Sequence, residues 1–288
     1  MREKHRMRIL IGTILIGILG VLTTSCNSKK MTDLSKSEFL TDSIYSKYLN
    51  EYRKHNVYLP KGFDSENEYP IIYATDGNSS LTEKKNLLDS LIDNQIIKPL
   101  IFVASFSNNK IADSTSTTTG DGKKVKLSYR NFEYVERKPM RLEDSLLVDR
   151  FQNHKLYFTK ELITEIEKNY NQEIGKTDRY FYGVSNGAGF GLSLLNNNPD
   201  IIGTYICFST FGGDIQSNTW NENVKYPNLY LRYGSDEFFG LKEDSEFLES
   251  KYAESNSFIE TKEYEGGHNN EFWKKEFSEI IPRILKFE

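Results

Sequence analysis

The sequence predicts an α/β protein of one domain, built on a mostly parallel central sheet with helices on both faces. Short apolar runs typical of buried strands alternate with stretches of helical periodicity through residues 71–287, and this alternation is the pattern of a parallel sheet. The length of 288 residues suits one large core, and no linker rich in Pro, Gly or Ser divides residues 46–288. A composition of 38% hydrophobic and 27% charged residues argues against disorder as the main state.

The first elements of the predicted domain are strands that end at turn residues. Residues 45–59 alternate imperfectly between apolar and polar side chains and read as one or two strands. Residues 71–74 and 100–104 are continuous apolar runs, as expected of strands buried on both faces. Between them, residues 81–94 carry apolar side chains at helical spacing. These elements predict a β-α-β unit in the first half of the sheet.

The alternation continues in the second half of the chain. Residues 158–170 place Leu162, Ile163 and Ile166 on one face, which predicts a helix. Further apolar runs and amphipathic stretches predict strands at 179–183, 201–208, 229–233 and 258–264, and helices at 186–198, 241–252 and 270–287.

Residues 108–126 interrupt this pattern. The segment 113–122 is polar and of low complexity, which predicts a long loop that serves as a functional lid or is a disordered insertion. Residues 127–150 are also expected to be irregular.

The N-terminus has the features of a targeting segment. Four basic residues precede an apolar run at 9–22, which is shorter than the ~20 residues that a membrane span needs. The small residue before Cys26 resembles a bacterial lipoprotein signal. That resemblance implies a signal peptide at 1–25, lipidation of Cys26 and membrane contact at the cell envelope through the lipid only; an ordinary secretory signal or an uncleaved anchor is the alternative. The polar residues 26–45 are expected to form a flexible tether.

Composition excludes several kinds of site. The net charge is −4 and no basic run lies outside the N-terminus, so no nucleic-acid partner is expected. Cys26 and Cys207 are the only cysteines, and Cys207 lies in a predicted buried strand, so no disulfide framework or Cys-rich metal site can form. The histidines have no metal-ligand spacing, and neither a metal nor a cofactor is expected.

The strongest functional signal is the sequence Gly183-Val184-Ser185-Asn186-Gly187, a G-x-S-x-G pattern between a predicted strand and a predicted helix. In this context the pattern predicts a nucleophile elbow, a tight turn that exposes the serine hydroxyl above the sheet. The flanking glycines would leave room for neighbouring backbone. Ser185 is therefore the candidate nucleophile, and a glycine-rich turn without chemistry is the alternative.

A serine nucleophile needs a base and an acid that orients the base. His268 follows a predicted strand end, on the same sheet edge as Ser185, and is the candidate base. The acid is expected between the two in chain order. Two adjacent carboxylates, Asp236 and Glu237, follow the strand that ends at Gly234. We favour Glu237 and expect Asp236 to face solvent or to cap the next helix.

The oxyanion that forms during acyl transfer needs backbone N–H donors. One donor is expected from Asn186, the residue after the nucleophile, and the second from the loop after an early strand. The Asp76-Gly77-Asn78 loop supplies two candidates, the N–H groups of Gly77 and Asn78. An ordinary Asp-Gly turn is the alternative reading of this loop.

Five segments in order along the chain resemble the putative-esterase family of α/β-hydrolases, which includes enterochelin, feruloyl and acetyl-xylan esterases and S-formylglutathione hydrolase. They read VYLPKGF at 57–63, YPIIYATDG at 69–77, YRNFEY at 129–134, GVSNG at 183–187 and GGHNNEFW at 266–273. The resemblance spans about residues 46–288. It implies an α/β-hydrolase fold and cleavage of carboxylic esters by a serine hydrolase.

Two classes of function remain open. The first is an envelope-anchored serine esterase that works through an acyl-enzyme on a small-molecule or glycan-linked ester, such as a siderophore or a polysaccharide ester. The second is a non-catalytic binding protein on the same scaffold, because fold alone does not decide function. The presence of serine, acid and histidine in the expected order favours the enzyme. Acyltransferases and peptidases use the same triad, and the sequence does not separate them from an esterase.

Overall fold

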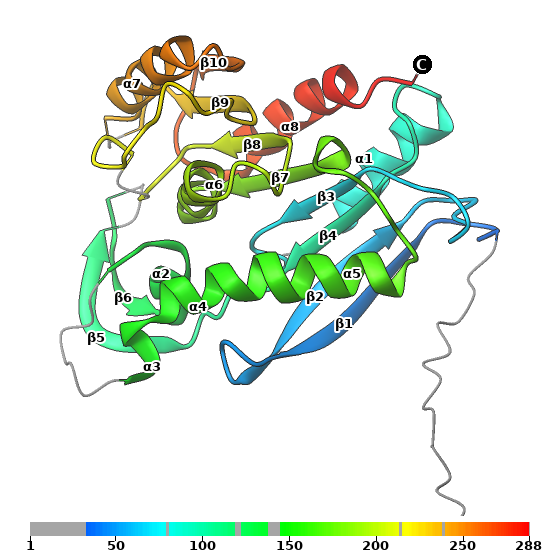
Figure 1. Cartoon of the computed structure of the whole chain (residues 1–288), viewed down its shortest axis with the longest axis horizontal. Helices are drawn as coiled ribbons and strands as arrows, with labels where there is room; N and C mark the ends of the chain where they lie inside the picture. The colour runs from blue at the N-terminus through cyan, green and yellow to red at the C-terminus, as the bar shows by residue number, and fades with distance from the viewer. Residues whose placement is uncertain are drawn as a thin grey trace, which may run out of the picture.

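A computed structural model describes residues 33–78, 81–118, 122–137, 145–212, 215–237 and 240–287. The predicted signal peptide, Cys26 and the first part of the predicted tether lie outside these ranges. The main sheet contains eight strands (Figure 1). They are β1 (Glu38–Ser46), β2 (Glu51–Leu59), β3 (Ile71–Ala74), β4 (Ile101–Ser105), β7 (Arg179–Val184), β8 (Thr204–Phe208), β9 (Asn228–Gly234) and β10 (Ile259–Tyr264).

The strand order is β1-β2-β4-β3-β7-β8-β9-β10. β1 pairs antiparallel with β2, and β2 pairs antiparallel with β4. Every neighbouring pair from β4 to β10 is parallel. The predicted mostly parallel sheet is therefore confirmed, and the carboxyl ends of its parallel strands share one edge.

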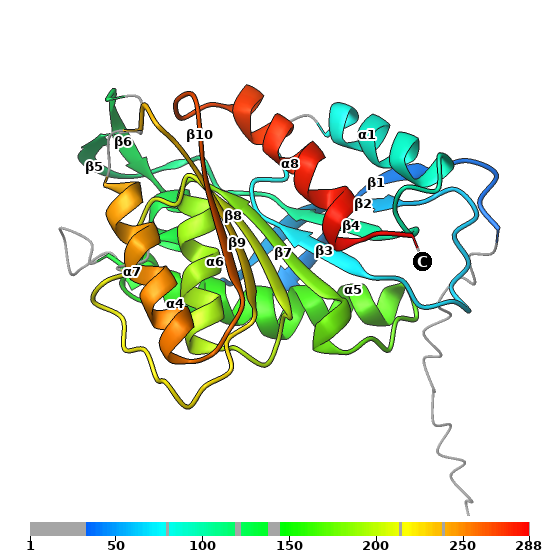
Figure 2. The ribbon, with the colours of Figure 1, turned by 90° about the horizontal axis from the view of Figure 1, so that it is seen from above.

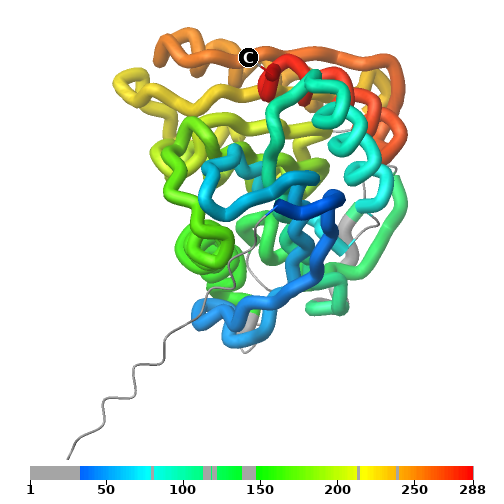
Figure 3. Tube along the Cα trace, turned by 90° about the vertical axis from the view of Figure 1, so that its right-hand side faces the viewer, coloured from blue at the N-terminus to red at the C-terminus, as the bar shows by residue number. Residues whose placement is uncertain are grey.

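Helices cover both faces of the sheet (Figure 2). They are α1 (Thr82–Asp93), α2 (Tyr129–Tyr134), α3 (Ser145–Val148), α4 (Arg150–Leu156), α5 (Ile163–Asn169), α6 (Asn186–Asn197), α7 (Leu241–Glu254) and α8 (Asn270–Ile284), with a π-helical turn η1 (Tyr157–Leu162) and a 3-10 turn η2 (Lys176–Asp178). The segment from α4 through η1 to α5, together with α6 and α7, packs on one face. On the other face α1 and α8 lie side by side, although they are far apart in the sequence (Figures 2 and 3). Within the described ranges, no helix combines the length and the apolar character that crossing a bilayer requires.

The two faces form two separate cores because side chains alternate along each strand. In β7, Phe181 packs in the core on the side of α6, called the first core. Tyr180 and Tyr182 pack in the second core, on the side of α1 and α8. Cys207 of β8 is fully buried in the first core, as its apolar neighbours in the sequence predict. The continuous apolar runs thus correspond to strands that are covered on both sides.

The predicted tether is wrong for residues 38–45. These residues form most of β1, which pairs along its whole length with β2. Five of the nine β1 residues are half-buried or buried, but they do not alternate regularly with the exposed ones, because residues 38–40 are all half-buried and residues 41–43 are all exposed. An edge strand that buries only part of one face carries a weak apolar signal, so its sequence reads as polar linker.

The prediction of a loop at 108–126 is also wrong. The segment contains two antiparallel strands, β5 (Ile111–Thr118) and β6 (Lys124–Ser128). Threonine-rich sequence favours strand, which explains how a low-complexity stretch can pair. Residues 127–150, expected to be irregular, contain α2, α3 and the start of α4. A capping box between Ser128 and Asn131 begins α2.

The first core depends on Phe190 of α6, whose ring contacts the rings of Tyr134, Phe151, His154, Phe158 and Phe181. We expect Phe190→Ala to lower the free energy of unfolding by about 3–5 kcal/mol, because it leaves a cavity among these rings. Chemical denaturation followed by circular dichroism measures this. Tyr52→Ala is the aromatic control, since Tyr52 is 72% exposed and packs edge-on against Tyr45 of the neighbouring strand, and should change stability by about 1 kcal/mol or less. Equal effects of the two substitutions would contradict the packing described.

Candidate active site

Ser185 lies in the turn that joins β7 to α6. Its backbone has φ 55° and ψ −129°, a conformation that L-residues rarely adopt. The Ser185 N–H donates to the carbonyl of Phe208 at 2.9 Å, and the Ser185 carbonyl accepts from the N–H of Phe211 at 3.1 Å. These bonds to the end of β8 fix the strained turn, which has the geometry of the predicted nucleophile elbow.

The two glycines of the motif are required by close packing. A Cβ at Gly183 would lie 2.7 Å from the Gly187 carbonyl, and a Cβ at Gly187 would lie 2.2 Å from Thr75 Oγ1. A larger residue at Gly183 would have to move backbone, and one at Gly187 would have to displace the Thr75 side chain. The glycines thus allow α6 to begin directly above the ends of β3 and β7.

The structure brings Ser185, His268 and Glu237 together in one chain of hydrogen bonds. His268 Nε2 lies 2.9 Å from Ser185 Oγ, and His268 Nδ1 lies 2.8 Å from Glu237 Oε2. The His268 ring also packs edge-on against Trp273 of α8, with 4.9 Å between ring centroids. With Nδ1 protonated, Nε2 is free to accept the serine proton, so the arrangement can activate the hydroxyl as a nucleophile.

Glu237 is held by donors from several strands. Its Oε1 accepts hydrogen bonds from Ser209 Oγ at 2.5 Å, the Gly234 N–H at 2.9 Å and Tyr264 OH at 2.9 Å. Trp273 Nε1 in turn donates to Ser209 Oγ at 2.7 Å. Burial alone would raise the pKa of Glu237, but the bonds from His268, Ser209 and Gly234 outweigh it and hold the pKa below its ordinary value of 4.5. The carboxylate therefore stays ionised beside His268.

Asp236 does not belong to this chain of hydrogen bonds. The residue is exposed, its N–H donates to the Gly266 carbonyl at 2.9 Å, and its carboxylate accepts from the neighbouring Ser235 hydroxyl at 3.2 Å. The structure thus agrees with the choice of Glu237 over Asp236 as the partner of His268.

The structure separates the two oxyanion candidates of the loop after β3. The Gly77 N–H donates to the Ser105 carbonyl at 2.8 Å, so it is not available to a substrate and the prediction of Gly77 as donor is wrong. Asn78 remains as a candidate oxyanion donor, and its side-chain Oδ1 accepts a hydrogen bond of 2.8 Å from Ser107 Oγ. Asn186 begins α6, where the first backbone N–H groups have no partner within the helix. The N–H groups of Asn186 and Asn78 are the remaining candidate donors.

Arg130 connects the loops that carry these donors. It makes a bidentate ion pair with Asp76, through Nε at 2.6 Å and NH2 at 2.8 Å, and donates from NH1 to Asn186 Oδ1 at 3.1 Å. Asp76 has φ 58°, so the ion pair stabilises an unfavourable backbone conformation. Arg130 was not among the site residues predicted from the sequence. Its place in the YRNFEY segment was the only available signal.

In the part of the chain that the structure describes, no three His, Cys, Asp or Glu side chains gather in a way that could hold a metal ion.

Comparisons with known proteins place the chain among α/β-hydrolases. The family model described as "Putative esterase" matches residues 46–284. Among solved structures, a ferulic acid esterase superposes with a TM-score of 0.63 at 17% identity, covering 87% of this chain and 98% of that one. The S-formylglutathione hydrolase of Agrobacterium tumefaciens superposes with a TM-score of 0.62 at 13% identity, covering 90% of this chain and 98% of that one. A ferulic acid esterase of Anaeromyces mucronatus superposes with a TM-score of 0.60 at 17% identity, covering 90% of this chain and 94% of that one. No curated protein sequence matches the chain.

The hydrogen bonds to Glu237 predict a pH-dependent contribution to stability. A carboxyl with a depressed pKa in the folded protein stabilises it above the unfolded pKa, near 4.5, and this contribution is lost as the pH falls through the folded pKa. Ser209→Ala removes one donor and raises the pKa of Glu237. We therefore expect the variant's deficit in free energy of unfolding to be full above pH 4.5 and to shrink at lower pH. Urea unfolding between about pH 3 and about pH 7 measures how this deficit in the free energy of unfolding changes with pH.

Ser250→Ala is the control for this titration, because Ser250 is exposed and its hydroxyl donates to the Phe247 carbonyl and not to a carboxylate. Its difference from the unsubstituted protein should not vary with pH. A Ser209→Ala deficit that is constant across the whole pH range would contradict the electrostatic account of Glu237.

Proposed function

Because the chain belongs to the putative-esterase family, a family of carboxylic-ester hydrolases, we propose that it cleaves esters as a serine hydrolase through an acyl-enzyme on Ser185. His268 is the general base and acid, and Glu237 orients His268 and stabilises its protonated form. The observation that carries the proposal is the unbroken chain from Ser185 Oγ through His268 to Glu237, with distances of 2.9 and 2.8 Å.

The proposed reaction follows from the positions of these groups. His268 Nε2 takes the proton of Ser185 as Oγ attacks the ester carbonyl, and then gives that proton to the leaving alcohol. Water, deprotonated by His268, releases the carboxylic acid and restores the serine. In both halves the N–H groups of Asn186 and Asn78 would stabilise the oxyanion, at a helix N-terminus whose dipole also favours negative charge.

Arg130 is the proposed positioning residue for this oxyanion site. Its guanidinium contacts both Asp76, two residues before Asn78, and the side chain of Asn186. Preorganised donors stabilise a transition state most when they need no rearrangement during the reaction. An arginine that fixes both loops supplies that preorganisation without touching the substrate.

For the substrate we propose a small-molecule or glycan-linked ester, such as a siderophore or a polysaccharide-linked ester. The similar structures named as ferulic acid esterases and as an S-formylglutathione hydrolase support the class of ester. We also propose that the protein is a lipoprotein, anchored at the bacterial cell envelope by a lipid on Cys26. The basic and apolar N-terminus supports that location.

Labelling of the purified protein with a fluorophosphonate probe tests the activated serine. We expect the unsubstituted protein to be labelled, and Ser185→Ala and His268→Ala to lose labelling, because the probe reacts with a serine only when a base removes its proton. Ser193→Ala is the matched control, since Ser193 is buried in α6 away from the motif. A folded protein that is not labelled would favour the non-catalytic binding protein instead.

The two neighbouring carboxylates make a second test. Glu237→Gln keeps the size of the side chain but removes the charge that orients His268, so we expect kcat for p-nitrophenyl acetate to fall by about 10⁴-fold. Asp236→Asn should leave kcat within about twofold, because Asp236 is exposed and does not contact His268. Steady-state kinetics at neutral pH distinguishes the two. A larger loss in Asp236→Asn would overturn the assignment of Glu237.

A further inference from the structure

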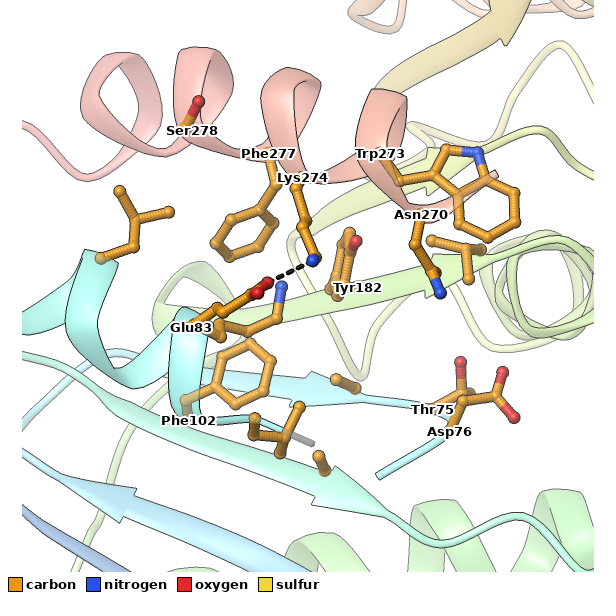
Figure 4. A pocket seen from close by; sticks show the side chains of 16 residues that line it. Thr75, Asp76, Glu83, Phe102, Tyr182, Asn270, Trp273, Lys274, Phe277 and Ser278 are labelled. Atoms are coloured by element: carbon orange, nitrogen blue, oxygen red, sulfur yellow. Dashed lines mark ion pairs between the residues drawn. The ribbon is translucent and has the colours of Figure 1, made fainter. Parts of the chain in front are cut away.

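A cavity of about 520 Å³ lies between α1, α8 and the face of the sheet (Figure 4). Pockets of roughly 300–1,000 Å³ are of the size that binds small molecules. The apolar part of the wall includes Phe102 from β4, Tyr182 from β7, Phe277 from α8 and Leu87 from α1. This cavity is separate from the groups that the proposed reaction uses, and nothing above assigns it a ligand.

Four charged residues line the cavity, and three of them are paired. Glu83 of α1 makes an ion pair with Lys274 of α8, which Figure 4 shows as a dashed line, and Asp76 pairs with Arg130. The fourth is Lys84 of α1. Among the described residues it makes no ion pair, and its Nζ lies over aromatic rings, 3.6 Å from the centroid of Phe277 and 4.4 Å from that of Tyr182.

The position of the Lys84 ammonium has a cost in free energy. Burial, together with repulsion from Lys274, lowers the pKa of Lys84 to about 7. The cation–π contacts with Phe277 and Tyr182 offset only part of the lost hydration. An anion bound in the cavity would restore the proton on Lys84, so the unpaired lysine favours an acidic ligand.

The cavity extends toward the candidate active site. Trp273 lines it and also packs against His268, and Val184, which precedes Ser185, lines it as well. In Figure 4, Asp76 and Trp273 lie toward one end of the pocket and Ser278 toward the other. A ligand that fills the cavity would therefore reach the neighbourhood of the reactive serine.

We propose that this cavity binds the apolar part of the ester substrate, and that Lys84 binds an acidic group carried by that part. The substrate class is then an ester in which an apolar chain or ring also bears a carboxylate. This inference rests on the proposed function for its link to Ser185, but binding to the cavity can be measured without catalysis.

Decanoate, an apolar chain with one carboxylate, is the probe. Isothermal titration calorimetry should show decanoate binding to the protein and equally to Ser185→Ala, whereas acetate should bind neither. Lys84→Met should weaken binding by about tenfold or more, because it removes a charged partner of the carboxylate. Lys85→Met is the matched control, since the Lys85 ammonium pairs with Asp89 at 2.6 Å outside this cavity. Leu87→Trp, which fills the cavity from α1, should abolish binding.

The pH dependence adds a second readout. A carboxylate stays ionised above about pH 6, so a loss of decanoate affinity between about pH 6 and pH 9 must come from the protein. We expect that loss in the unsubstituted protein, as Lys84 gives up its proton, and not in Lys84→Met. The other charged groups at the cavity, Glu83, Lys274 and Asp76, are paired and are the same in both proteins.

Three outcomes would overturn the inference. Absence of decanoate binding to a folded protein would remove the cavity as a ligand site. Binding that survives both Lys84→Met and Leu87→Trp would place the probe elsewhere. Binding that does not slow fluorophosphonate labelling of Ser185 would separate the cavity from the substrate. A protein that binds decanoate but is never labelled would overturn the proposed catalysis instead, so the two failures are distinguishable.

Discussion

The strained backbone of Ser185 is the constraint on which the site depends. Its φ of 55° and ψ of −129° direct the hydroxyl out of the sheet, and an isolated turn would not keep this conformation. Bonds from the end of β8 hold it, and glycines at 183 and 187 let the first turn of α6 pack onto Thr75 and the end of β7. The same contacts bring the N-terminus of α6 over the loop after β3. One local conformation therefore sets the positions of both the proposed nucleophile and its candidate oxyanion donors.

The two cores of the sheet hold the remaining parts of the site. The core with α6 supports the elbow from one side, through Phe190 and its aromatic neighbours. The core with α1 and α8 supports the acid and the base from the other, because Trp273 packs against His268 and also donates to Ser209, which binds Glu237. Trp273 thus contributes both to the core and to the arrangement of the site. A substitution of Trp273 affects the orientation of the His268 imidazole as well as the stability of the fold.

Most of the fold could be predicted from the sequence, because parallel strands buried on both faces are short apolar runs and their helices keep a clear period. Ser185 and His268 could be chosen as candidates from the sequence because the G-x-S-x-G motif and the Gly266-Gly267-His268 segment each follow a predicted strand. The structure was needed where a residue's role depends on contacts with residues that are distant in the sequence. The Gly77 N–H is used by Ser105, and Glu237 rather than Asp236 meets His268. β1 has a weak pattern because it lies at the sheet edge and is only partly buried. The β5–β6 hairpin was missed because a polar, threonine-rich composition reads as loop.

The groups of the proposed catalytic site come from segments that are synthesised at different times. Ser185 and His268 are 83 positions apart, and Ser209 and Trp273 are 64 apart. When β7 and α6 have formed, the elbow exists but has no base, and α8 is the last helix of the chain. Synthesis proceeds from the N-terminus at about 5–20 residues per second, and a domain generally folds as a unit. Under the proposed function, a chain that ends before His268 has no base for Ser185 and carries an unreactive serine. Completion of the fold would then be the step that makes the serine reactive.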